Sequence, residues 1–175
     1  ISVKNDRTFV VNNLKVMKMK TIHLLLLFCT TTFCLGQNHE GELKKIISQQ
    51  ESDWNKNDMK SFSQAFSDDA VLINFLGMYW QGKENISTEF SHINECCIKP
   101  TSVKFDWIDS KTLSENAAVA HMKETLTAKE DYAVPGGVVK KGTVNSKFIT
   151  AVFEKKNTVW KIVSMQVTQV NGPPK

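Results

Sequence analysis

A single carboxylate interrupts an otherwise apolar side of the strand predicted over residues 116–128. Alternate residues of a strand point to the same side of a sheet, and Glu124 shares its side with Ala118, Ala120, Met122, Leu126 and Ala128. If that side faces a cavity, Glu124 is an inward carboxylate and a candidate general base for proton transfer. If the side is a dimer surface, or if the strand is bulged, Glu124 is solvated. His121 lies on the opposite side, so we do not expect it to form a catalytic pair with Glu124.

Several other side chains are candidates for binding a ligand. Tyr79, Trp80 and Tyr132 could line or cover the mouth of a cavity, and packing explains each of them as well. On the last predicted strand, Gln166 shares a side with Trp160, Ile162, Ser164 and Thr168. These positions therefore mark a possible binding site without fixing its chemistry.

Two adjacent cysteines, Cys96 and Cys97, remain outside the N-terminal segment. Adjacent cysteines bond to each other only through a strained ring, so we interpret them as two small apolar residues rather than as a redox switch. The sequence contains no Cys-x-x-Cys motif and no paired ligand spacing. It therefore predicts no metal site.

Helices are expected in the first half of the chain beyond residue 40. Apolar residues recur at helical spacing over residues 40–55, over a short segment that Asn57 or Asp58 can cap, and over a third segment that begins after Gly82. Residues 70–80 are typical of a short hairpin.

From Val103 onwards the apolar period changes to two, which predicts strands from 103, over 116–128, over 143–154 and over 159–168. The loop over residues 129–142 contains glycine and proline and is long enough to fold over a cavity. Helices followed by strands favour an α+β fold, with helices on one face of a curved antiparallel sheet.

Short motifs in this order make residues 40–170 resemble the nuclear-transport-factor-2-like (NTF2-like) superfamily, and within it the SnoaL-like branch. They are Trp54 to Asp58, Phe66 to Val71, Gly77 through Gly82 to Ile86, Trp160 to Ile162, and Gln166 to Thr168. The resemblance implies a cone-shaped α+β fold with three N-terminal helices packed on a curved antiparallel sheet. It also implies a hydrophobic cavity and frequent dimerisation through the outer face of the sheet. It implies no single activity, because this fold hosts isomerases, dehydratases, cyclases and association domains.

The resemblance also gives expectations for individual residues. In members resembling ketosteroid isomerase, a carboxylate four residues after the alanine of the Asp-Asp-Ala segment is the general base, and here that position is Asn74. An amide cannot accept a proton at neutral pH, so Asn74 is expected to hydrogen-bond a ligand or to be a satisfied strand residue. Trp54 stands near a cavity tyrosine of those members. It offers an indole donor but no acid, so it is a candidate ligand contact, although it is interpreted first as a core residue. Gln166 matches a polar position of the terminal motif and is a candidate ligand donor.

Basic residues are concentrated in the first 36 positions, which hold five of the 22 Lys and Arg residues and one of the 18 acidic residues. Without them, 17 basic residues (22 minus 5) face 17 acidic residues (18 minus 1), and no arginine remains because Arg7 is the only one. Arginine is the usual residue for bidentate contacts to phosphate or guanine. We therefore expect no nucleic-acid partner.

Residues 17–36 have the pattern of a secretory signal peptide, with two lysines, an apolar run and small residues before a cut after Gly36. The apolar run is too short for a membrane-spanning helix. Residues 1–16 precede the first methionine and are interpreted as a non-native extension, which leaves 37–175 as one SnoaL-like domain. These features predict a secreted or periplasmic protein with no membrane association after cleavage.

The sequence thus predicts a homodimer that binds a small, largely apolar molecule without metal, nucleotide or other cofactor. Dimerisation is expected because the strand over 143–154 is apolar on both sides, with Phe148 and Val152 on one and Ile149, Ala151 and Phe153 on the other. One alternative is a cofactor-free isomerase, dehydratase or cyclase that uses Glu124 as base. A homo-association module without ligand is the other. A filled cavity would favour the association module, and an open cavity with an isolated carboxylate would favour the enzyme.

Overall fold

The computed structural model describes residues 39–134 and 136–170. The predicted extension over residues 1–16 and the predicted signal peptide over 17–36 lie outside the described residues. In the part of the chain that is described, no helix is long and apolar enough to cross a membrane.

The first helix, α2 (Glu40–Asn55), spans the residues that its apolar period predicts. Leu43, Ile47 and Gln50 are buried along one face, and Trp54 continues that face at the same spacing. The short helix α3 (Met59–Ser63) follows, and the Asp58 carboxylate caps it by accepting a hydrogen bond from the backbone nitrogen of Ser61 at 2.9 Å.

A glycine marks the start of the third helix, α4 (Lys83–His92). Gly82 has a φ of 86°, in the left-handed region that L side chains rarely adopt, while its backbone nitrogen bonds the carbonyl oxygen of Ala70 at 2.8 Å. This geometry lets the chain turn sharply out of the short strand β2 (Tyr79–Gln81) and begin a helix that buries Ile86 and Phe90. A π-helical segment, η1 (Asn94–Ile98), follows it.

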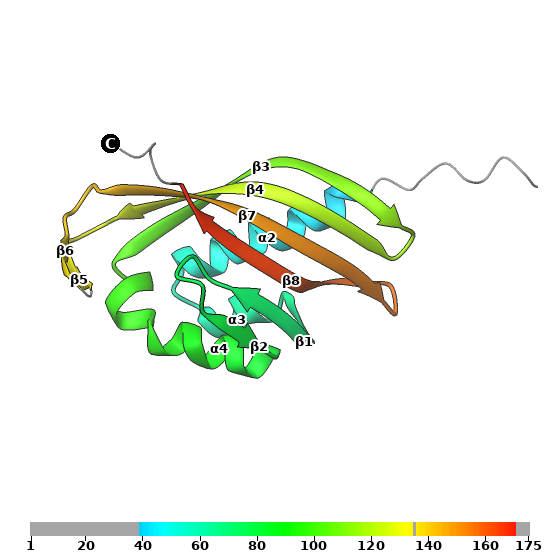
Figure 1. Cartoon of the computed structure of the whole chain (residues 1–175), viewed down its shortest axis with the longest axis horizontal. Helices are drawn as coiled ribbons and strands as arrows, with labels where there is room; N and C mark the ends of the chain where they lie inside the picture. Colours follow the sequence, from blue (N-terminus) through cyan, green and yellow to red (C-terminus); the bar gives the residue numbers. More distant parts are fainter. Residues whose placement is uncertain (1–38, 135, 171–175) are drawn as a thin grey trace, which may run out of the picture. The chain divides into compact units, whose positions relative to one another are not determined.

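Six strands form one curved sheet, in the order β2-β1-β8-β7-β4-β3, and α2 packs on one of its faces (Figure 1). All neighbouring strands are antiparallel except β1 and β8, which run parallel. The sheet is therefore antiparallel, as expected, apart from this one parallel pair. Its strands are β1 (Phe66–Ile73), β2 (Tyr79–Gln81), β3 (Thr101–Ser114), β4 (Ala117–Ala128), β7 (Val144–Lys156) and β8 (Val159–Gln169).

The loop expected over residues 129–142 contains a small hairpin of its own. Strands β5 (Tyr132–Val134) and β6 (Gly137–Val139) pair with each other in a separate two-stranded sheet. This hairpin lies at the end of the domain where β4 ends and β7 begins (Figure 1).

The edge strand β3 is tied to helix α2 by side chains. Asn55 bonds both the backbone nitrogen and the carbonyl oxygen of Val103, each at 2.9 Å. Glu51 accepts a hydrogen bond from the backbone nitrogen of Phe105 at 2.6 Å. These contacts satisfy backbone groups that an edge strand would otherwise expose, and they fix the helix against the sheet.

The core fills the space between the helices and the inner face of the sheet. Its fully buried side chains include Phe66 and Leu72 from β1, Ile86 from α4, Phe153 from β7 and Ile162 from β8. Toward the end of the domain that carries β5 and β6, this packing gives way to a cavity.

Candidate functional site

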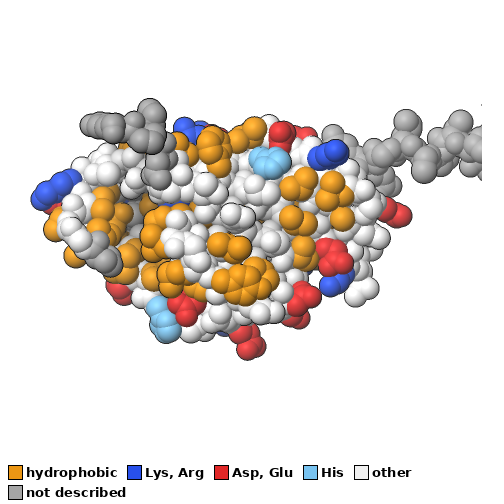
Figure 2. Space-filling view, in the orientation of Figure 1, with side chains coloured by type: hydrophobic (Ala, Val, Ile, Leu, Met, Phe, Trp, Pro, Cys, Tyr) orange, Lys and Arg blue, Asp and Glu red, His pale blue; other side chains and the backbone are white. Residues whose placement is uncertain are grey.

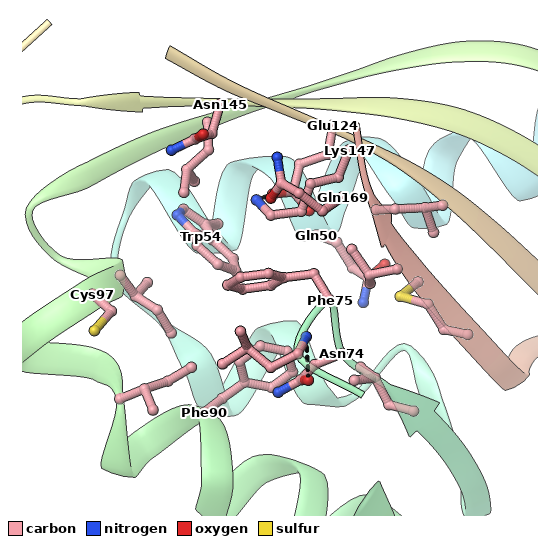
Figure 3. Close-up of a pocket in the computed structure, with 18 of the residues that line it drawn as sticks. Gln50, Trp54, Asn74, Phe75, Phe90, Cys97, Glu124, Asn145, Lys147 and Gln169 are labelled. Atoms are coloured by element: carbon pink, nitrogen blue, oxygen red, sulfur yellow. Dashed lines mark hydrogen bonds and ion pairs between the residues drawn. The ribbon is translucent and has the colours of Figure 1, made fainter. Parts of the chain in front are cut away.

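A cavity of about 480 Å³ lies between the helices, the inner face of the sheet and the β5–β6 hairpin (Figure 3). Most of the side chains that line it are apolar. The few polar ones lie mainly on β4, β7 and β8, so that the cavity has a polar side on the sheet and an apolar side on the helices. The open cavity matches the expectation of a hydrophobic space within the cone.

Four aromatic rings form the apolar side. Phe90 on α4 makes edge contacts with Phe62, Trp80 and Trp54, at centroid distances of 5.0, 5.4 and 6.2 Å. Because the four rings come from α2, α3, α4 and β2, this cluster joins the three helices to the hairpin formed by β1 and β2. It presents a wide hydrocarbon surface to whatever occupies the cavity.

Trp54 and Trp80 both line the cavity. The indole nitrogen of Trp54 donates to the hydroxyl of Thr101 at 3.2 Å. The N–H group of the Trp54 indole is already bonded to a protein acceptor. Trp54 therefore contributes a ring face to the cavity and not a hydrogen bond.

The polar side is built around a buried ion pair. Glu124 faces the cavity, and one oxygen of its carboxylate lies 2.5 Å from the ammonium nitrogen of Lys147. The two side chains are 9% and 5% exposed. They are direct neighbours in the register of β4 and β7, so the sheet itself holds them together.

The surroundings of this pair are both polar and apolar. Asn145 and Gln169 line the same side of the cavity, and the ring of Phe75 lies 5.0 Å from the Lys147 nitrogen (Figure 3). The Gln169 amide nitrogen is bonded to backbone carbonyl oxygens, that of Ser146 at 3.2 Å among them. On the inner face, Met122 and Ile149 lie beside the pair toward the core.

Asn74 lines the cavity but serves the turn between β1 and β2. Its side-chain oxygen accepts hydrogen bonds from the backbone nitrogens of Leu76 and Met78, at 2.9 and 3.0 Å. An asparagine at the start of a turn commonly bonds the backbone in this way. The residue at the position of the general base in ketosteroid isomerase-like proteins therefore shapes the hairpin here.

Tyr132 comes from the β5–β6 hairpin and lines the cavity. Burial raises the pKa of its hydroxyl above the ordinary value. The phenol therefore stays neutral at physiological pH. The hairpin supplies Val134 and Val139 to the same wall.

Two candidates from the sequence, Tyr79 and Gln166, lie outside the cavity. Tyr79 is 58% exposed on the short edge strand β2, where its neighbour Trp80 takes the inward position. Gln166 is exposed because β8 contains a bulge: Val152 pairs with Ser164, whereas the next residue, Phe153, pairs with Ile162.

One residue of β8, between Ile162 and Ser164, has no partner on β7. This extra residue reverses which side chains of β8 point inward. Before the bulge Trp160 and Ile162 point inward, and after it Met165, Val167 and Gln169 do so. The inward polar residue of the last strand is therefore Gln169 and not Gln166.

Four polar residues of the cavity were missed in the sequence: Gln50, Asn145, Lys147 and Gln169. Gln50 carries a signal, because it continues the buried face of α2 and is 1% exposed, with its amide nitrogen bonded to the carbonyl oxygen of Phe62 at 3.3 Å. Lys147 carries one too, because it shares a side of its strand with Ile149, Ala151 and Phe153. A lysine on an apolar side of a strand requires a buried partner.

His121 and the two cysteines complete the set of candidate reactive groups. His121 is exposed on the opposite side of β4 from Glu124, as expected, and its ring nitrogen Nδ1 lies 2.7 Å from a carboxylate oxygen of Asp109.

Cys96 and Cys97 form a disulfide with each other, in contrast to the expected reading as two small apolar residues. Within residues 39–134 and 136–170, no group of three His, Cys, Asp or Glu side chains could hold a metal ion.

Comparison with known proteins reveals relatives in structure only. No family model and no curated protein matches the chain. A protein with a cystatin-like fold from Caulobacter vibrioides superposes with a TM-score of 0.65 at 21% identity, over 74% of this chain and 87% of that one.

Two further solved structures resemble the chain to a similar degree. An NTF2-like protein of unknown function from Shewanella oneidensis has a TM-score of 0.58 at 18% identity, over 75% of this chain and all of that one. A ketosteroid isomerase-like protein from Erwinia carotovora atroseptica has a TM-score of 0.61 at 14% identity, over 78% of this chain and 99% of that one. These likenesses confirm the α+β, NTF2-like fold that the sequence predicts.

Proposed function

We propose that this NTF2-like domain binds a small, largely apolar molecule in its cavity. The observation that supports the proposal is the cavity itself, whose volume of about 480 Å³ falls within the usual range for small-molecule sites. Such sites are lined mainly by hydrophobic and aromatic side chains with a few polar groups that fix orientation. The aromatic cluster around Phe90 and the Glu124–Lys147 pair fit that description.

The same geometry favours ligand binding over the two alternatives. A module that only associates with other chains has no need of an open cavity, and core packing normally removes one. An enzyme that uses Glu124 as general base needs its carboxylate to reach the substrate proton. The Glu124 carboxylate is paired with Lys147, and a cavity of this kind binds a ligand without any chemical step, so we rank the cofactor-free isomerase, dehydratase or cyclase second.

A fluorescence titration with N-phenyl-1-naphthylamine, a neutral apolar dye, tests the proposal. We expect a saturable increase in fluorescence with one site per chain. The variant Leu126→Trp places an indole at a half-buried residue of the cavity wall and should weaken dye binding at least about tenfold, equivalent to about 1.4 kcal/mol.

The adjacent variant Thr125→Trp is the matched control, because Thr125 lies next to Leu126 on β4 and points to the other face of the sheet. It should bind the dye as the native protein does. Near-ultraviolet circular dichroism establishes that both variants are folded. A native protein that gives no saturable signal, or a folded Leu126→Trp variant with undiminished affinity, would contradict the proposed function.

We also propose that the protein is a homodimer through the outer face of the sheet. Phe148 on β7 is 50% exposed on that face. Val119 on β4 and Val152 on β7, which pair with each other, lie on the same face. Apolar side chains are also spread over the middle of the surface drawn in Figure 2, where charged side chains lie mostly toward the rim. Large apolar side chains exposed on the outer face of a sheet are candidates for burial against a partner.

Light scattering at micromolar concentration should give a molar mass of twice the chain mass. Phe148→Lys places a charge in the interface and should reduce the measured mass to that of one chain. Val138→Lys is the control, because Val138 is similarly exposed but lies on β6 of the hairpin. A native protein that scatters as a single chain would refute the dimer.

A further inference from the structure

An apolar ligand alone does not explain the Glu124–Lys147 pair in the cavity wall. Both side chains are at least nine-tenths buried and face the cavity from the inner side of the sheet. A buried ion pair contributes little net stability compared with apolar residues of the same size, because removing both charges from water is costly. The fold therefore has no need of charges at these two positions.

Within the described part of the chain, the pair has hydrogen-bonding capacity to spare. The Lys147 ammonium has three donors, and the structure shows one of them bonded, to Oε1 of Glu124. No protein partner of the other carboxylate oxygen is seen among residues 39–134 and 136–170. Buried polar groups with free capacity are normally satisfied by water or by a ligand, and here both groups face the cavity.

The charge of the pair limits what the ligand can present to it. The negative charge of Glu124 and the positive charge of Lys147 cancel, so the polar side of the cavity has donors and acceptors but no net charge. A ligand carboxylate would meet the Glu124 carboxylate, and a ligand ammonium would meet Lys147, each in a poorly solvated space where like charges repel strongly. A neutral group that both donates and accepts would satisfy both residues together.

Resting on the proposed function, we propose that the ligand carries an uncharged hydroxyl-type group bound jointly by Glu124 and Lys147. The group donates a hydrogen bond to the free carboxylate oxygen of Glu124 and accepts one from the Lys147 ammonium. The body of the ligand lies against the Phe90 cluster on the opposite side of the cavity (Figure 3). The ligand class is therefore an apolar, ring-bearing alcohol or phenol.

Calorimetry with four naphthalene probes tests this assignment at neutral pH. The probes share one body and differ in the head group: naphthalene has none, 2-naphthol donates and accepts, 2-methoxynaphthalene only accepts, and 2-naphthoate is an anion. Because hydrogen bonds to charged groups are among the stronger ones, 2-naphthol should bind at least about fivefold more tightly than naphthalene. It should also bind more tightly than the methoxy compound, and 2-naphthoate should bind at least about tenfold more weakly than 2-naphthol.

The double variant Glu124→Met with Lys147→Met removes both charges while keeping two flexible apolar side chains, and it should bind 2-naphthol and naphthalene within about twofold of each other. Lys123→Met is the matched control, because Lys123 is exposed on the opposite side of β4; it should leave the order of affinities unchanged. Tightest binding of 2-naphthoate, or a 2-naphthol preference that survives in the double variant, would overturn the assignment. Failure of all four probes to bind would instead contradict the proposed function.

Discussion

Replacing Lys147 with methionine while Glu124 remains is expected to lower the free energy of unfolding by about 3 kcal/mol or more. The Glu124 side chain is 9% exposed and bonded to the Lys147 ammonium. Without that partner, its carboxylate must either stay charged in a poorly solvated wall or take up a proton, and both cost stability. The Glu124 side chain keeps 9% of its surface exposed, which places the expected loss at the lower end of the range for broken buried pairs.

Adding Glu124→Met to Lys147→Met should recover most of the lost stability. The double variant is expected to lie within about 1 kcal/mol of the native protein or above it, since apolar replacements of buried pairs are commonly neutral or stabilising. Urea unfolding of the native protein, both single variants and the double variant completes a double-mutant cycle. Lys123→Met, one position away on the outer side of the strand, should change stability little. Additive losses in the cycle would show that the two charges are solvated independently and do not act as a pair.

The elements that carry the site were predictable wherever the apolar period is regular. Helix α2 has the bounds that its spacing predicts, and Asp58 caps α3 as expected. On β4 the alternation is unbroken from Ala118 to Leu126, so the inward position of Glu124 follows from the sequence once that side is taken to face the cavity. In such segments local periodicity and tertiary packing agree.

The rest of the site depends on interactions between strands, which the sequence of one strand does not contain. The bulge in β8 reverses the alternation after Ile162, so reasoning from a regular strand selects Gln166 in place of Gln169. The partner of Glu124 depends on the register of β7 against β4. The sequence does show that Glu124 and Lys147 each interrupt an apolar side of a strand. Their opposite charges could have been used to predict that the two strands are neighbours and that the residues form a pair.

The two phenylalanines of β7 should differ sharply in their contribution to stability. Phe153 is fully buried between its register neighbours Ala118 and Ile162, whereas Phe148 is half exposed on the outer face. Phe153→Ala removes a ring from a packed region and leaves a void that its neighbours fill only in part. It should therefore lower the free energy of unfolding by about 3–5 kcal/mol.

Phe148→Ala is the matched substitution on the same strand, and in the isolated chain it should cost less than about 1 kcal/mol, as is usual at exposed positions. Urea unfolding measured at several protein concentrations separates this local cost from the proposed dimer. If Phe148 is covered by a second copy, the cost of Phe148→Ala grows with protein concentration, because association stabilises only the folded chain, while the cost of Phe153→Ala does not. Equal losses for the two variants at every concentration would mean that Phe148 is packed within its own chain, and would remove the support for the outer face as the interface.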